Sequence, residues 1–371
     1  MLGLGNNLAR GGVLGFSNTY SLEFDGTDEY VAIADTANLR FDAADADFSI
    51  SAWVKLVAPT DGGEQVIINK VDAINDGWRF LVLDDYIGGN VNATTAGYVL
   101  HGITDTGWHH YATTVDRNSE GKVYVDAILK NTRSISAESM ATTGEIKIGY
   151  KGYGTGQPLN GNIDEVAIWN TALSSGSISN IYNNGVPTDL LADSNSANLQ
   201  GWWRMGDGRL DSFNLIADQV NPTLGSEVLG DPEFNTDVSE GVTGTYWGLQ
   251  SGAGEYYIAD GSLNCESTEG GLNCSAQSAP VVAGKLYKIV FTISGHSTGG
   301  VLPYVGGTAG TTTSYDGTHT QYIVATNTSA FKFNTQSTPT LKVDNVSVKQ
   351  VNGNPGLMTN MDAVDIGKDT P

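Results

Sequence analysis

The sequence has few basic residues and no long apolar run. Of its 371 residues, 19 are Lys or Arg and 41 are Asp or Glu, so the formal net charge is −22. Nucleic acids and anionic membrane surfaces are bound by clustered basic side chains, and this composition therefore argues against both partners. No apolar run approaches the roughly 20 residues that a membrane-spanning helix needs, so we expect no membrane insertion.

Cysteine is almost absent. Cys265 and Cys274 are the only two, and both lie in one polar, Gly-rich stretch. Two cysteines form no disulfide framework, and no Cys/His cluster has zinc spacing. The sequence allows either one small-loop disulfide or two free thiols.

Long helical periodicity is also nearly missing, and short alternating segments separated by turns take its place. The 47 Gly residues suit many turns, and the 16 Tyr and 7 Trp residues suit strands. One short helix is expected over residues 174–183, with Ser174 as its cap and Asn184-Gly185 as its end. The sequence therefore predicts an all-β chain, and its length suggests two or three domains.

The order of these segments predicts two tandem antiparallel β-sandwich (jelly-roll) domains with extended N- and C-terminal arms. The predicted parts are an arm over 1–18, a first sandwich over 19–208, a linker over 209–228, a second sandwich over 229–350 and a tail over 351–371. The tail alternates in apolar content but has no core of its own. We expect both arms to be ordered by docking onto a partner, such as another copy of the chain.

Two strands share an irregularity. Residues 163–169 read IDEVAIW and residues 343–349 read VDNVSVK, and in each the apolar alternation slips by one residue at a polar pair that begins with Asp. Such a slip is typical of a β-bulge. We therefore predict a bulged closing strand in each sandwich, at Asp164-Glu165 and at Asp344-Asn345.

The first half resembles the laminin-G-like, concanavalin A-like jelly-roll domains. The resemblance covers about residues 19–206 and rests on the following segments: SLEFDGTDEYVAI (21–33), FSISAWVK (48–55), GWHHYATTVD (107–116), KVYVDA (122–127), LNGNIDEVAIWNTALS (159–174) and GWWRMGDG (201–208). It implies two stacked antiparallel sheets. Members of this family commonly bind glycans or proteins, often with Ca²⁺.

The second half, residues 229–350, resembles small jelly-roll carbohydrate-binding modules. The matching segments are DPEFN (231–235) followed by a Trp, AGKLYKIVFTIS (283–294) and the closing VDNVSVK. The two modules, between a Gly-rich start and a GLMTNM-type end, are similar to structural proteins of marine tailed phages.

The resemblance to the first family raises the question of catalysis, because laminarinase-type glycoside hydrolases share that fold. These enzymes need a Glu-x-Asp-x-x-Glu strand that places nucleophile and acid/base on one face. The nearest run here, over residues 23–28, ends in Asp and contains a Gly turn. Asp164 and Glu165 are adjacent, so on a regular strand they face opposite sides. We expect no enzyme.

Acidic residues at turns and bulges are candidate calcium ligands, because Ca²⁺ binds oxygen. The two resemblances point to Asp25 and Asp164 in the first domain, and to Asp231, Glu233 and Asp344 in the second. The alternative is that these carboxylates accept hydrogen bonds from turn amides. A structural Ca²⁺ would show as a melting temperature that falls when a chelator is added.

Exposed aromatic rings are candidate platforms for sugars, which stack on them. The first domain offers Trp78, Tyr86, Tyr98 and Tyr153, and the second offers Trp247, Tyr256 and Tyr304. A wider set adds Tyr150, Tyr257 and Tyr315. The alternative for each is ordinary packing in the core, a role that suits Trp53, Trp108 and Trp169 better.

Together these features predict a non-enzymatic virion surface protein that contacts host-surface glycans or decorates a capsid or tail. The N-terminus is a poor signal peptide, which suggests synthesis in the host cytoplasm and display after assembly. We expect a homo-oligomer that binds other virion proteins through its arms. One alternative is a purely structural decoration or fibre subunit without a ligand. Another is a secreted bacterial adhesin or glycan-binding accessory protein.

Overall fold

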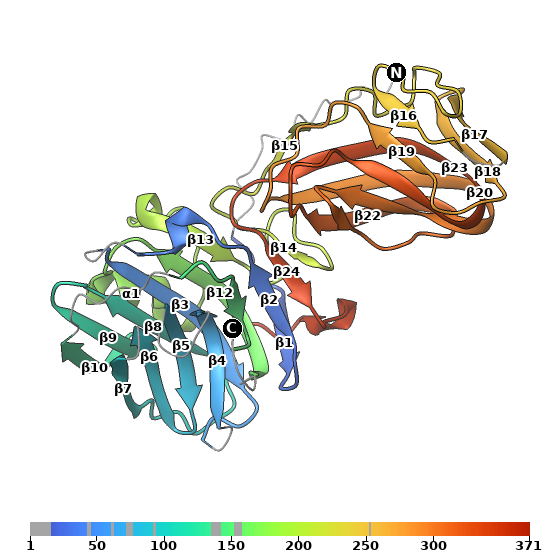
Figure 1. The fold of residues 1–371 in the computed structure, drawn as a ribbon. Coiled ribbons are helices and arrows are strands. Elements are labelled where there is room, and N and C mark those ends of the chain that lie inside the picture. The colour runs from blue at the N-terminus through green and yellow to red at the C-terminus, as the bar shows by residue number, and fades with distance from the viewer. Residues whose placement is uncertain are drawn as a thin grey trace, which may run out of the picture.

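The computed structural model describes residues 16–42, 46–60, 63–71, 77–91, 94–134, 142–151, 158–251 and 254–371. These residues form two β-rich domains joined at a narrow junction (Figure 1). The all-β prediction is confirmed. In the described part, the α-helix α1 (Ser175–Tyr182) begins where the Ser174 side chain accepts a hydrogen bond from Ser177 N, and ends at Asn183 in the left-handed conformation. No described helix is long and apolar enough to cross a membrane.

The first domain is a sandwich of two antiparallel sheets. One sheet has the order β10 (Ile128–Ser134), β9 (Glu120–Val125), β8 (His109–Val115), β3 (Phe48–Leu56), β12 (Asn160–Trp169), β1 (Ser21–Asp25) and β25 (Ile366–Gly367), with β13 (Leu199–Trp203) also paired to β12. The other has the order β14 (Leu215–Ile216), β24 (Gly356–Thr359), β2 (Tyr30–Ile33), β11 (Ile146–Ile148), β4 (Glu64–Lys70), β5 (Trp78–Leu83), β6 (Tyr86–Val91) and β7 (Thr94–Leu100). Short 3-10 helices lie at Ala37–Leu39, Asn183–Gly185, Ser196–Asn198 and Ala363–Asp365.

The core of this domain lies between its two sheets. On β3, the alternating residues Phe48, Ile50, Ala52, Val54 and Leu56 are buried there, as the alternation predicts. A second apolar layer covers the outer face of the same sheet, where Trp169 and Trp202 pack with Ile178 and Ile181 of α1.

The C-terminal segment belongs to the first domain. β24 pairs with β2 and with β14, and β25 pairs with β1, so the segment extends both sheets. Met358 and Met361 join the core between the sheets. Asp369 accepts a hydrogen bond from Trp108 Nε1 at 2.9 Å and forms an ion pair with Lys55. The expectation that this tail docks onto a partner is therefore corrected: its apolar alternation is that of strands completed by the same chain.

The second domain is a jelly-roll-type sheet that curls around its own core. Its strands are β15 (Leu224–Glu227), β16 (Trp247–Leu249), β17 (Gly254–Ala259), β18 (Ser262–Ser267), β19 (Asn273–Ala276), β20 (Leu286–Val305), β21 (Thr308–Ala309), β22 (Gly317–Val324) and β23 (Lys332–Val351). The two 20-residue strands β20 and β23 pair along most of their length. Register shifts within this pair bend it, which lets one sheet enclose a core.

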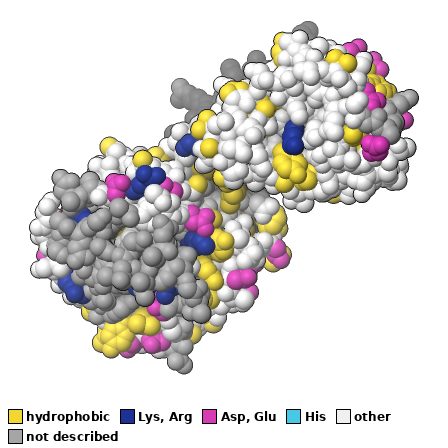
Figure 2. Space-filling model, in the orientation of Figure 1, with side chains coloured by type: hydrophobic (Ala, Val, Ile, Leu, Met, Phe, Trp, Pro, Cys, Tyr) yellow, Lys and Arg dark blue, Asp and Glu magenta, His cyan; other side chains and the backbone are white. Residues whose placement is uncertain are grey.

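The segment expected as a linker is structured, and it connects the two domains. β14 pairs with β24 of the first domain and β15 pairs with β23 of the second. A small apolar cluster lies between the domains: Leu215, Leu286 and Val351, with Leu224, Tyr322, Val324 and Leu357 around them. Hydrophobic side chains are visible where the two lobes meet (Figure 2). The chain crosses this junction twice, so the second domain is inserted into the first.

Both predicted bulges are present. On β12, Asp164 faces Trp53 and Ala167 faces Ser51, so two residues oppose one. On β23, Asp344 faces Thr292 and Ser347 faces Val290, which is the same arrangement.

The backbone geometry of the two bulges also agrees. Glu165 and Asn345, the residues after each Asp, have φ values of 49° and 50°. In each bulge the Asp carboxylate accepts the next backbone N–H, at 2.7 Å for Asp164 and 2.5 Å for Asp344.

The two cysteines are buried free thiols in the core of the second domain. Burial raises the pKa of both the Cys265 and the Cys274 thiol. Of the two alternatives left open by the sequence, the structure therefore has the thiols. Because thiolate is the reactive form, these groups are inert in this environment.

Candidate functional site

A groove with a volume of about 1090 Å³ lies at the junction of the domains. One side is the edge strand β22 with the segment 308–313 that runs beside it, and the other side is formed by residues 212–214 and 357–359. β14 and β24, which flank or contain these last residues, lie against the second domain near β22 (Figure 1). Segments from both domains therefore build one site.

Three aromatic side chains line this groove. Phe213 is 42% exposed and Tyr315 is 65% exposed, so both rings are accessible to a ligand. Tyr322 is half-buried, and its hydroxyl lies 3.2 Å from Ser212 Oγ on the opposite side. Exposed rings of this kind can stack on an apolar face of a ligand.

The alternation of β22 explains why these groups point into the groove. Ile323 and His319 point inward to the core, so Thr318, Thr320 and Tyr322 occupy the outer face. The ring of Tyr315, just before the strand, meets His319 edge-on with centroids 4.7 Å apart. This contact fixes the position of an otherwise exposed ring.

Hydroxyl and amide groups complete the lining. Gln321 holds the segment 308–313 in place: its Oε1 accepts from Thr311 N at 2.7 Å and its Nε2 donates to Thr311 O at 2.7 Å. Thr308, Thr312 and Thr313 face the same space. No carboxylate is among the described residues that line the groove. The arrangement offers ring stacking and neutral hydrogen bonds, which are groups for recognition.

Three of the aromatic residues proposed from the sequence are core residues. Trp78, Trp247 and Tyr256 are each only 1% exposed. Trp78 packs near Phe48, and Trp247 packs on Phe234 with ring centroids 4.9 Å apart. Their rings have no face open to a ligand, so the interpretation of these three as platforms is corrected in favour of packing.

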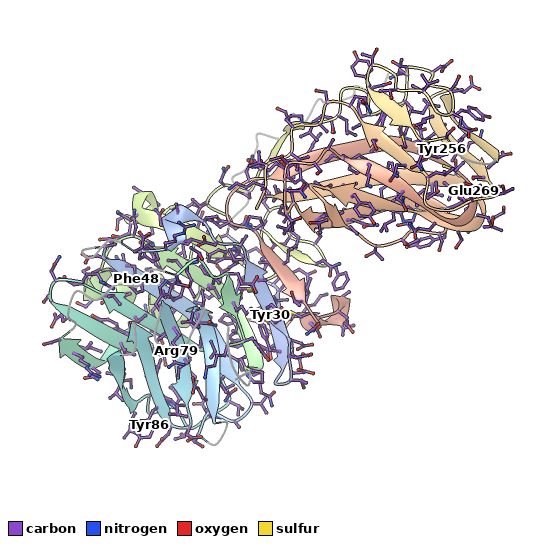
Figure 3. All side chains as sticks on the ribbon, in the orientation of Figure 1. Tyr30, Phe48, Arg79, Tyr86, Tyr256 and Glu269 are labelled. Carbon is purple, nitrogen blue, oxygen red and sulfur yellow. The ribbon has the colours of Figure 1, made fainter. Side chains whose placement is uncertain are left out.

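The other proposed aromatic residues do not meet in one site either. Tyr86 is 41% exposed, but it lies at the edge of the first domain far from the second (Figure 3). Tyr304 is half-buried, with Lys332 Nζ 4.7 Å from its ring centroid. The side chain of Tyr98 and the whole of Tyr153 lie outside the described residues.

The groove instead contains Tyr315, from the wider set, together with Phe213 and Tyr322. Phe213 lies in the segment taken for a linker, and Tyr322 lies within a segment expected as a strand. The period-two alternation around Tyr322 was the one available signal that it points away from the core.

The candidate calcium ligands are engaged with backbone amides. Asp25 accepts from Thr27 N at 2.7 Å, and Asp231 accepts from Asn235 N and Thr236 N, both at 2.9 Å. Asp344 accepts from Asn345 N as described above, and Glu233 is exposed. In the described part of the chain, no group of three or more His, Cys, Asp or Glu side chains is placed to hold a metal ion. Calcium stays a prediction.

The bulge in the first domain is a buried ionisable cluster. Glu165 accepts from Trp202 Nε1 at 2.6 Å and from Arg204 Nε at 3.0 Å, and Asp164 accepts from Asn18 Nδ2 at 2.9 Å. Burial is the main cause that raises the pKa of Glu165 to about 7, and burial together with Glu165 raises the pKa of Asp164. The side chains that donate to this pair come from neighbouring segments of the same domain. The pair therefore holds β12 and the residues near position 18 in place.

Comparison with known proteins bears on the first domain. The family described as the concanavalin A-like lectin/glucanases superfamily matches residues 25–179. These residues supply most strands of the two sheets of the first domain. The first domain is therefore a concanavalin A-like lectin/laminin G domain. A search among curated proteins found no match to the sequence.

Solved structures similar to the chain come from several sources. A protein from Bacteroides ovatus, proposed to bind carbohydrate, is 16% identical, with coverage of 55% of this chain and 56% of that one and a TM-score of 0.43. A heptameric pentraxin from Limulus polyphemus is 15% identical, with coverage of 44% and 82% and a TM-score of 0.37. Domain 4 of an arabinanase from Geobacillus stearothermophilus, solved with arabinotriose, is 18% identical, with coverage of 45% and 82% and a TM-score of 0.35.

Proposed function

We propose that this chain is a non-enzymatic carbohydrate-binding protein whose ligand occupies the groove at the domain junction. The observation that carries the proposal is the set of rings from Phe213, Tyr315 and Tyr322 in one groove lined by hydroxyl and amide groups. The concanavalin A-like lectin type of the first domain supports the same class of ligand.

The chemistry of the groove suits a sugar chain. A pyranose has an apolar face, which stacks on an aromatic ring, and a rim of hydroxyls, which exchange hydrogen bonds with threonine and amide groups. The groove has Phe213 on one side and Tyr315 and Tyr322 on the other, and its volume of about 1090 Å³ leaves room for several sugar units. The Tyr322–Ser212 contact shows that the two sides lie close enough to hold one ligand.

Substitution of the rings tests the proposal. Phe213→Ala and Tyr315→Ala should each weaken retention of the full chain in gels that contain a bound polysaccharide by about fivefold, because stacking contributes roughly 1 kcal/mol per ring. Affinity electrophoresis over a panel of polysaccharides measures this retention.

The matched control is Tyr86→Ala, which removes a similarly exposed ring far from the groove. Retention that survives both groove variants but is lost with the control would place the ligand in the first domain instead. A panel in which no polysaccharide retards the chain would overturn the proposed function.

For the setting, we propose display on the surface of a virus particle, where glycan binding would serve attachment to a host. The pairing of a lectin-type domain with a second jelly roll supports this setting and also supports the alternative, a secreted bacterial glycan-binding accessory protein. Mass spectrometry of purified particles and of cell-free culture medium distinguishes the two. Absence from particles would exclude the virion role, including that of a purely structural subunit.

A further inference from the structure

The charges around the groove differ from those of the rest of the chain. Acidic residues outnumber basic ones by 41 to 19 in the sequence, yet no Asp or Glu is among the described residues that line the groove. Lys288 is the one Lys or Arg in that lining. On the face seen in Figure 2, the acidic side chains of the second domain gather at its end away from the first domain.

Lys288 belongs to a row of side chains across three strands. It pairs in register with Tyr322 of β22 on one side and with Lys349 of β23 on the other. Residues directly opposite in an antiparallel pair project from the same face, so Lys288 lies next to Tyr322 on that face. Lys349 lies on the same face one strand further away, beside the groove lining rather than in it. Two like charges directly opposite each other destabilise a sheet unless an opposite charge lies near them.

No carboxylate of the described residues forms an ion pair with Lys288 or Lys349. The ion pairs that are present, such as Lys55–Asp369 and Lys70–Asp35, lie in the first domain.

Glu227 is the carboxylate directly opposite Lys349, and its oxygens are directed to neutral donors rather than to the ammonium group. Glu227, opposite Lys349, accepts from Val348 N at 2.8 Å and from Ser347 Oγ at 2.7 Å. Asp316 accepts from His296 N at 2.8 Å. Lys288 therefore lines the groove next to Tyr322 without a carboxylate partner among the described residues.

We propose that the ligand of the groove is an acidic polysaccharide, whose carboxylate or sulfate groups are bound by Lys288 and Lys349 while a sugar ring stacks on Tyr322. This inference rests on the proposed function and specifies the class of glycan. An anionic group would accept charge-assisted hydrogen bonds from the two ammonium groups and remove their mutual repulsion. The net charge of −22 does not prevent this, because interactions between exposed charges are screened beyond about 8 Å at physiological salt.

Matched pairs of polysaccharides test the proposal with the full chain. One pair is polygalacturonate and its carboxyl-reduced form, and the other is dextran sulfate and dextran. We expect retention by an acidic member at least about tenfold stronger than by its neutral counterpart, and weaker in high salt. Preference for the first or the second acidic polymer distinguishes carboxylate from sulfate recognition.

Variants that remove one lysine charge test which residues bind the acidic groups of the polymer. Lys288→Gln and Lys349→Gln should each reduce retention by the acidic polymer about five- to tenfold and change retention by the neutral one less than twofold, in keeping with a charge-assisted contact. Lys342→Gln is the matched control, because Lys342 is an exposed lysine of β23, the strand of Lys349, and pairs with Ser294 and Asn264 rather than with Lys288.

The outcomes separate this inference from the proposed function. Equal retention by acidic and neutral polymers, lost in Phe213→Ala, would overturn the acidic ligand and leave carbohydrate binding in place. An equal effect of Lys342→Gln and Lys288→Gln would also overturn it, because the preference would then follow net charge alone. Lack of retention by these polymers and by the wider panel would overturn both.

Discussion

The two bulged strands have the same backbone and different surroundings. In β12 and in β23 an Asp accepts the N–H of the next residue, and that residue takes a φ near 50°. In β12 the pair Asp164-Glu165 is buried and bonded to Arg204 and Trp202, whereas in β23 Asp344 is half-buried and Asn345 is exposed. The bulge is thus a feature of the fold, and the burial of Asp164 and the presence of Glu165 in place of an Asn make the one in β12 a buried ionisable pair.

The difference shows why an acidic pair in a strand is a weak sign of chemistry. A bulge needs an acceptor for one free N–H and a residue that tolerates the left-handed region, and Asp followed by Asn satisfies both needs. Glu165 is less suited to that conformation, so its ion pair with Arg204 and its bond from Trp202 must compensate. The first domain therefore depends on polar contacts where the second does not.

The largest effect is expected from removal of residues 352–371. The first domain then loses β24 and β25 from its two sheets and Met358 and Met361 from its core. Each buried methionine contributes roughly 2–5 kcal/mol, against a typical total of about 5–15 kcal/mol for a domain. Scanning calorimetry should show the transition of the first domain lost and that of the second retained. Two unchanged transitions would show that the segment is dispensable.

A smaller effect is expected from truncation of the bulges themselves. Glu165→Ala leaves the buried Trp202 and the half-buried Arg204 without their carboxylate, and should lower the free energy of unfolding of the first domain by roughly 3–5 kcal/mol. Asn345→Ala changes an exposed residue and should lower that of the second by roughly 1–2 kcal/mol, the strain of a left-handed alanine. Urea unfolding of the two variants measures both values. Equal losses of stability would contradict the expected difference between the two bulges.

The smallest effect is the pH dependence. The pKa of Glu165 is raised from 4.5 to about 7 in the folded protein, so the folded state holds its proton more tightly than the unfolded state. Stability from this group is fully present below pH 4.5 and is lost as the pH rises through 7, by no more than about 3 kcal/mol. Burial raises the pKa of Asp211 to about 6, which acts in the same direction.

Unfolding curves between pH 5 and pH 8 test this dependence. Glu165→Gln should flatten the dependence of the first domain, while Asp344→Asn, the corresponding change in the other bulge, should leave it as it is. His110 acts in the opposite direction, because burial lowers its pKa to about 4 and the first domain therefore gains stability from this group as the pH rises towards 6.5. The test is the difference between the unmodified chain and Glu165→Gln, and an equal pH dependence of the two would contradict the assignment of the Glu165 pKa.

Much of the fold could be predicted from the sequence, because many of its elements depend on local patterns of residues. The period-two alternation of β3, the slip at each bulge and the Ser cap of α1 all depend on residues close together in the chain. The position of the C-terminal segment could not be predicted, because no pattern of neighbouring residues indicates that Ser21 pairs with Gly367. The same alternating residues suit a partner chain and the chain itself equally well.

The candidate site was harder to predict than the fold. Its residues come from four separated parts of the chain, and their convergence depends on how the two domains meet. Aromatic residues such as Trp78 and Trp247 resemble platforms in sequence, since burial depends on the opposite sheet rather than on neighbours. Phe213 lacked any pattern because the segment around it pairs through only the two residues of β14.

The return of the chain to the first domain has a consequence for folding during synthesis. The strands β24 and β25 leave the ribosome only after the whole second domain has been made. The second domain has all its strands within residues 224–351, so it can fold as soon as it emerges. The first domain must wait, because its sheets stay open at β1 and β2 and such distant pairings form slowly. The domain that is translated first is therefore the one that is completed last.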